Sequence, residues 1–184
     1  MTLHADARNV LAHWAAPDDE QEHLRVTYLA HLDAHTDALS RECHPDHLTA
    51  SALIFSADHA QVLLTLHHVI KRWLQTGGHC DPEDESMSAA ALREAHEESG
   101  IPGLTIDPVP VLLSRHEVPR CGPIRPSHHL DVQYVAVAPA GATHVISEES
   151  DALEWFAVDE LPDGTDHSVR ALIAASKTRL RGTP

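Results

Sequence analysis

The 184-residue sequence has little positive charge. Its 13 lysines and arginines stand against 28 aspartates and glutamates, which gives a formal net charge of −15 with histidine neutral. A protein that binds the nucleic-acid backbone needs a surface rich in lysine and arginine, because its affinity comes largely from released counterions. The charge therefore argues against nucleic acid as the main partner. It fits a protein that binds cations, or one whose charge simply keeps it in solution.

Cysteine and long apolar runs are also scarce. Cys43, Cys80 and Cys121 are odd in number and far apart, so they form neither a disulfide framework nor a CxxC zinc pattern. The first ten residues include Asp6 and lack the apolar core of a secretory signal. No apolar run approaches the length of a membrane helix. We therefore expect a cytoplasmic protein that does not enter a membrane.

Histidine, by contrast, is abundant but scattered. Of the 17 histidines, only the pairs His67-His68 and His128-His129 are adjacent in sequence. A surface histidine is more often a solvated side chain than a metal ligand, and zinc sites usually show closely spaced histidines and cysteines. The spacing therefore argues against a zinc site.

Hydrophobic spacing predicts helices over the first 40 residues. Leu24, Tyr28 and Leu32 recur every four residues, and a break at Pro17 separates this stripe from an earlier one. We predict a helical extension over residues 1–45, in the form of a helical hairpin.

From Leu48 onwards the pattern alternates between strands and helices. The segment 86–99 is rich in alanine and precedes Gly100, which predicts a helix with a glycine cap. A second helix is predicted over 166–180. Strands are predicted at 48–55, 61–68, 71–74, 110–118, 130–138 and 153–158. This order predicts an α/β domain over residues 46–184, with helices on both faces of a mixed sheet.

The predicted helix 86–99 contains a cluster of carboxylates. Because each residue turns the helix by about 100°, Glu94, Glu97 and Glu98 lie within an arc of about 100°. Like charges at this spacing repel one another, and the helix macrodipole disfavours anions near its carboxyl end. A divalent cation would offset both effects, and oxygen ligands favour Mg²⁺ or Mn²⁺ over zinc. Taken alone, however, a solvated acidic face explains the cluster better.

The neighbouring residues make a metal site the better interpretation. Residues 93–101 read REAHEESGI. This stretch resembles the second half of the Nudix box, Arg-Glu-apolar-x-Glu-Glu-x-Gly-apolar, which is the signature of the Nudix hydrolases. In the first half of the box, a glycine is followed by five residues, a glutamate and seven further residues before the arginine. Gly77-Gly78 lie at nearly this distance before Arg93. The segment between Gly78 and Arg93 is one residue longer than the family pattern, so either Asp84 or Glu85 fills the acidic position.

The resemblance covers roughly residues 48–160 and implies the Nudix fold, an α/β/α sandwich around a mixed β-sheet. The helical extension lies outside it. Family members often take a further metal-binding carboxylate from a loop near the end of the domain. The stretch SEESDALEWF offers Glu149 as the first choice and Glu148 as the second. A solvated acidic turn is a nearly equal explanation for this pair.

Nudix enzymes hydrolyse a diphosphate linked to another group, mostly in nucleoside diphosphate derivatives. The resemblance implies Mg²⁺ or Mn²⁺ as cofactor, which would offset the charge of the substrate and make a water more acidic. It implies Glu97, Glu98 and the carbonyl of Gly77 as primary ligands. Glu94 would bind metal or orient the water as a base, and Arg93 would hold the glutamates through bidentate hydrogen bonds.

Two other functions on the same fold stay open. A diphosphate isomerase would use a cysteine in a Cys-Ser-His-Pro setting, which Cys80 in GGHCDP does not match. A nucleotide-binding module that has lost catalysis would usually lack a glutamate of the box, whereas Glu94, Glu97 and Glu98 are all present. The sequence does not identify the diphosphate substrate. The apolar stripes of the extension would pack either on the core or across a homodimer.

Overall fold

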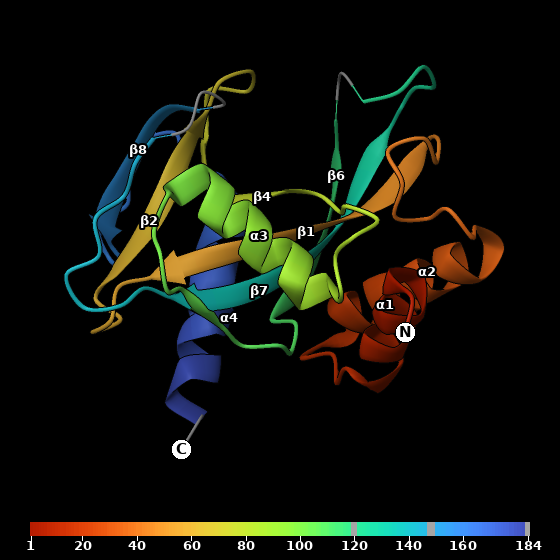
Figure 1. Ribbon diagram of the computed structural model, residues 1–184, viewed down its shortest axis with the longest axis horizontal. Coiled ribbons are helices and arrows are strands. Elements are labelled where there is room, and N and C mark those ends of the chain that lie inside the picture. The colour runs from red at the N-terminus through yellow and green to blue at the C-terminus, as the bar shows by residue number, and fades with distance from the viewer. Residues whose placement is uncertain (119–120, 147–149, 183–184) are drawn as a thin grey trace.

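The computed structural model describes residues 1–118, 121–146 and 150–182 (Figure 1). Its helices are α1 (Leu3–His13), α2 (Asp19–Ala34), α3 (Met87–Ser99) and α4 (His167–Gly182). Its strands are β1 (Asp46–Phe55), β2 (Gln61–His67), β3 (Trp73–Leu74), β4 (Thr76–His79), β5 (Thr105–Ile106), β6 (Leu112–Glu117), β7 (His128–Val137) and β8 (Ser150–Ala157). The helices and six of these strands lie where the sequence predicts them, with boundaries that differ by a few residues.

Strand β1 organises the sheet. Along one edge it pairs in parallel with β7 over its whole length. Along the other edge it pairs antiparallel, with β4 in its middle and with β2 at its end. The other strand pairs are antiparallel, with β3 and β8 on β2 and with β5 and β6 on β7. The sheet is therefore mixed, as the sequence predicts.

Strands β4 and β5 are the two that the sequence pattern misses. β5 is only two residues long. β4 reads TGGH, and two glycines give it neither alternation nor strand propensity. It becomes a strand only because four of its residues pair with β1.

Alternation along β1 gives the sheet two different faces. Ala50, Ala52 and Ile54 belong to a buried core that includes the alanines of α3. Leu53 and Phe55 point to the opposite side, where they form a second core with α4. Figure 1 shows α3 crossing in front of the sheet and α4 behind it, so helices cover both faces. The small side chains of β1 allow α3 to lie close to the strand.

The N-terminal helices pack on this domain. The indole of Trp14 donates to the carbonyl of Pro110 at 2.7 Å. The side-chain amide of Gln21 pairs with the backbone of Leu113 in both directions, at 2.7 and 3.0 Å. The apolar residues of both helices join the same core as α3: Ala7, Leu11, Tyr28 and Leu32. Their apolar stripes are thus buried within the chain, while the division into residues 1–45 and 46–184 stays a prediction. None of the described helices is long and apolar enough to cross a membrane.

Candidate active site

Helix α3 is held at both ends. The hydroxyl of Ser86 accepts a hydrogen bond from the N–H of Ala89 at 3.1 Å, and Gly100 ends the helix with a φ of 63°. A second cap comes from α1, where the buried carboxylate of Asp6 accepts from the N–H of Met87 at 2.8 Å. Because this carboxylate lies at the positive end of the helix macrodipole, it stabilises the helix electrostatically as well.

Arg93 joins the carboxylates around α3. Its Nε and Nη2 donate to the two oxygens of Asp84 at 3.0 and 2.9 Å. Its Nη1 donates to Glu94 at 2.8 Å and to Glu97 at 3.1 Å, and its Nη2 also donates to the carbonyl of His79 at 3.0 Å. The hydrogen bonds to Asp84, and then the hydrogen bond to Glu94, raise the pKa of Arg93 despite its partial burial. The guanidinium therefore stays charged and holds Glu94 and Glu97 on one side of the helix.

Gly77 and Gly78 bring β4 close to its neighbours. A Cβ on Gly77 would lie 2.3 Å from Cβ and 2.6 Å from Cα of Ser51 in β1. A Cβ on Gly78 would lie 2.5 Å from Oε2 of Glu94. The N–H of Gly77 donates to Oε1 of Glu98 at 2.7 Å. A side chain at Gly77 would collide with β1, and one at Gly78 would collide with the carboxylate of Glu94.

The glutamates open onto a cleft of about 1450 Å³. The polar part of the sheet forms its floor. Asp131 of β7 is buried there and accepts hydrogen bonds from the hydroxyls of Thr49, at 3.0 Å, and Ser51, at 2.7 Å. The cleft wall includes the predicted site residues Gly77, Arg93, Glu94, Glu97 and Glu98.

The two candidates for the first acidic position of the box have different surroundings in the structure. Asp84 makes the bidentate contact with Arg93, whereas Glu85 is exposed. The two candidates for a further ligand, Glu148 and Glu149, lie outside the described residues.

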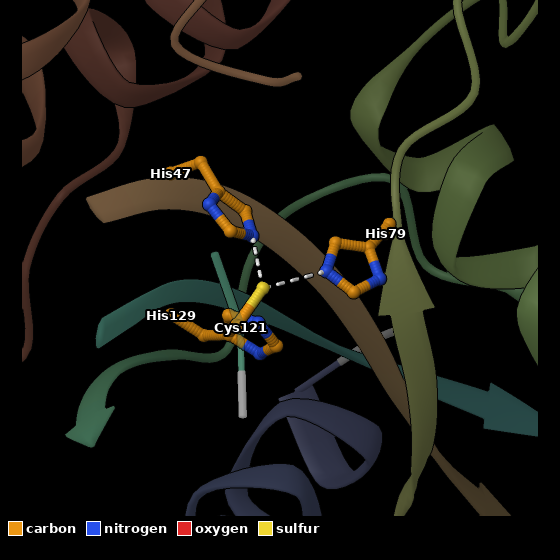
Figure 2. A group of neighbouring side chains, drawn as sticks. All are labelled: His47, His79, Cys121 and His129. Atoms are coloured by element: carbon orange, nitrogen blue, oxygen red, sulfur yellow. Dashed lines mark hydrogen bonds between the residues drawn. The ribbon is translucent and has the colours of Figure 1, made fainter. Parts of the chain in front are cut away.

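Sequence reasoning does not find a second polar group next to the glutamates. His47, His79, Cys121 and His129 come together from separate parts of the chain (Figure 2). Burial, with nearby positive charge as a smaller cause, lowers the pKa of His79 to about 4 and that of His129 to about 3. Both imidazoles are therefore neutral at pH 7. The wide spacing in sequence hides this group. The pairing of β1 with β7 and β4 brings the three histidines together, and the loop between β6 and β7 adds Cys121.

A family model described as the NUDIX domain matches residues 45–175, well over half of the chain. The chain belongs to the Nudix family. The resemblance of REAHEESGI to the Nudix box is thereby confirmed. As a member of this family, the protein is a Nudix hydrolase, an enzyme that acts on phosphoric anhydrides.

Several solved structures share its fold. A NUDIX-family hydrolase from Clostridium perfringens is 24% identical with a TM-score of 0.57, over 71% of this chain and 94% of that one. The MutT NUDIX hydrolase from Burkholderia pseudomallei is 26% identical with a TM-score of 0.54, over 71% of this chain and 97% of that one. An Ap4A hydrolase from C. elegans in a binary complex is 19% identical with a TM-score of 0.58, over 74% of this chain and 98% of that one. These matches confirm the α/β Nudix fold. No curated protein sequence matches the chain significantly.

Proposed function

We propose that this Nudix hydrolase is a pyrophosphohydrolase that requires Mg²⁺ or Mn²⁺ and cleaves the diphosphate linkage of a nucleotide or nucleoside diphosphate derivative. The main support is the meeting of Glu94, Glu97 and Glu98 with Gly77 at one cleft. Arg93 fixes two of these glutamates by direct hydrogen bonds. A solvated acidic face would need neither the arginine nor the glycine pair.

The donor atoms suit a hard divalent cation. Glu94, Glu97 and Glu98 supply carboxylate oxygens, which Mg²⁺ and Mn²⁺ prefer to nitrogen or sulfur. The carboxylate of Glu94 lies directly against the backbone of Gly78, where a Cβ would meet its Oε2 at 2.5 Å. The residues present therefore fit such a cation. When bound, the cation would neutralise phosphate charge and make a water more acidic.

The chain's own side chains have separable roles in this proposal. Glu97 and Glu98 bind the cation, together with the backbone of Gly77. Glu94 binds it or takes the proton of the attacking water, and Arg93 holds its Oε1 in place. Arg93 positions the glutamates and offsets their mutual repulsion.

The substrate class is proposed from two similar structures and from the cleft. One is the C. elegans Ap4A hydrolase complex, and another is the NUDIX domain of Shewanella oneidensis NrtR with ADP ribose, 23% identical with a TM-score of 0.52. Both names refer to nucleotides with linked phosphates. Arginines that line the cleft would attract such a polyanion: Arg41, Arg72 and Arg115.

A panel assay tests this proposal. The protein is incubated with nucleoside triphosphates, dinucleoside polyphosphates and nucleotide sugars, each with Mg²⁺, Mn²⁺, Ca²⁺ or chelator, and the products are separated and identified by mass. We expect hydrolysis with Mg²⁺ or Mn²⁺, little with Ca²⁺ and none with chelator. Nucleotide binding without turnover would favour the inactive binding module, and a rearranged product without added water would favour the isomerase. Turnover that chelator leaves unchanged would contradict the metal site. A cytoplasmic location and a homodimer stay predictions.

A further inference from the structure

A second group of metal-ligating side chains gathers at the same cleft as the glutamates, and three of its four members line that cleft. Figure 2 shows the four side chains together. It consists of His47 in β1, His79 in β4, Cys121 in the loop between β6 and β7, and His129 in β7. One ligand atom from each of these residues lies within 4.8 Å of the other three. We propose that the four residues bind one Zn²⁺ ion, separate from the cation at the glutamates.

The distances around Cys121 match a tetrahedral zinc site. Its Sγ lies 3.6 Å from Nε2 of His47 and 3.7 Å from Nε2 of His79. With zinc bonds of about 2.3 Å to sulfur and about 2.0–2.1 Å to nitrogen, tetrahedral geometry places sulfur and nitrogen about 3.6 Å apart. The rings of His47, His79 and His129 lie 4.9–5.1 Å from one another between centroids. The three imidazoles and the thiol therefore lie close enough to share one ion, and Figure 2 shows the sulfur of Cys121 between the rings of His47 and His79.

Two of the imidazole rings present a nitrogen that can bind a metal. Nδ1 of His47 lies 3.2 Å from the carbonyl of Cys43. A carbonyl can only accept, so Nδ1 donates the proton and Nε2 presents its lone pair toward Cys121. Nε2 of His129 is buried without a hydrogen-bond partner among the described residues. A buried ring nitrogen without a hydrogen bond raises the free energy of the folded state, and coordination to a metal ion removes this penalty.

The ligand chemistry favours zinc over the cations expected at the glutamates. Three nitrogens and one sulfur suit a borderline-soft ion, whereas Mg²⁺ and Mn²⁺ prefer oxygen. Four protein ligands also complete the tetrahedral shell, as in structural zinc sites, and leave no position for a reacting water. The ion would therefore stabilise the fold, not catalyse the reaction.

A zinc ion here would join parts of the chain that meet next to the active site. It would tie β1, β4 and β7 to the loop that contains Cys121. His79 directly follows Gly78, and its carbonyl accepts a hydrogen bond from Arg93 at 3.0 Å. The ion would thus fix the end of the strand on which the glycine pair and one anchor of Arg93 lie.

Metal analysis of the full-length protein tests the proposal without relying on enzyme activity. The protein is produced without a polyhistidine tag in zinc-supplemented medium, purified without chelator and analysed by elemental mass spectrometry. We expect about one zinc per chain. Removal of zinc with a strong chelator should lower the thermal midpoint, and added Zn²⁺ should restore it. Co²⁺ in place of zinc should give a thiolate-to-cobalt absorption band.

Five variants locate the ion. Cys121→Ala and His129→Asn should lose the bound zinc. His116→Asn should keep it, because this exposed ring lies 5.6 Å from the ring of His129 but outside the group of four. Glu97→Gln should also keep it, which separates this ion from the proposed Mg²⁺ site. Cys43→Ala tests the other group of potential ligands found among the described residues, which is His35, Asp37 and Cys43.

Several outcomes would overturn the proposal. The first is a wild-type protein that neither retains zinc nor is stabilised by added Zn²⁺. The second is zinc that both Cys121→Ala and His129→Asn retain. The third is zinc that only Cys43→Ala loses. Stoichiometric iron or copper in place of zinc would overturn the choice of metal. If the variants do not fold, the cobalt spectrum of the wild-type protein decides, since absence of the thiolate band excludes Cys121 as a ligand.

Discussion

Arg93 and Asp84 form a bidentate ion pair between α3 and the loop that precedes it. Nε donates to Oδ1 at 3.0 Å and Nη2 donates to Oδ2 at 2.9 Å. The side chain of Asp84 is only 7% exposed and that of Arg93 29%, so the pair is partly shielded from water. The same guanidinium reaches Glu94 and Glu97. One guanidinium therefore connects the loop to both glutamates.

Removal of the charge on Asp84 should loosen this arrangement. In Asp84→Asn, we expect the free energy of unfolding to fall by about 2 kcal/mol, less than for a fully buried pair because Arg93 is partly exposed. Urea unfolding measures the change. Glu85→Gln is the matched control, because it removes the same charge from the next, exposed residue. We expect it to stay within about 0.5 kcal/mol of the parent. Equal losses in both variants would contradict a stabilising role for the pair of Asp84 with Arg93.

Glu97→Gln tests the catalytic cation site with little change in shape. We expect turnover to fall at least 100-fold, or about 3 kcal/mol in the activation barrier. Without metal, stability should change by less than about 0.5 kcal/mol, because the lost pair with Arg93 and the relieved repulsion from Glu94 oppose each other. Stabilisation by Mg²⁺ should shrink. A variant that hydrolyses diphosphate substrates at close to the parent rate would refute the proposed role.

Asp6 should matter to α3 although it lies in the N-terminal extension. Asp6→Ala leaves the N–H of Met87 without its acceptor and removes a negative charge from the helix amino end. We expect the free energy of unfolding to fall by about 1–2 kcal/mol. Asp33→Ala is the control, since Asp33 pairs with Arg8 at 2.7 Å with both side chains about half exposed. It should cost at most about 1 kcal/mol. A smaller loss in Asp6→Ala than in Asp33→Ala would argue that the extension does not support α3.

Asp166 should make stability depend on pH in the acid range. Its carboxylate accepts hydrogen bonds from the N–H and hydroxyl of Ser168, at 3.0 and 2.9 Å, and from Arg72 at 2.9 Å. Burial alone would raise the pKa of Asp166, but the hydrogen bonds from Ser168 and Arg72 outweigh it and lower the pKa below its ordinary value. The stabilisation is therefore fully present above the unfolded pKa of about 3.9 and is lost as pH falls through the lower native pKa.

Denaturant unfolding at a series of pH values tests this dependence. Asp166→Ala should reduce the free energy of unfolding by about 1 kcal/mol at pH 7, because Asp166 lies directly before α4 at the cap position. The difference from the parent should shrink below about pH 4. Asp163→Ala, which removes an exposed carboxylate nearby, should show neither effect. A deficit in Asp166→Ala that grows on acidification would contradict the lowered pKa.

Helix α3 is the part of the molecule that could best be predicted without a structure. Its alanines, its caps at Ser86 and Gly100 and its glutamates all lie within one short stretch. Interactions along a helix join residues three or four apart, so the sequence alone places them on a common face. Strand β4 could not be predicted in this way, because its glycines become a strand only through pairing with β1.

The sequence by itself determined the family, the α/β order of elements and the arc of glutamates, because each depends on residues that are neighbours along the chain. Only the tertiary structure showed that Asp84 pairs with Arg93 and that Asp6 caps α3. It alone brought His47 and His129 opposite each other on β1 and β7. Hydrophobic periodicity shows which face of a strand is buried. The register between distant strands follows from pairing and packing summed over the whole sheet, and no local pattern encodes it.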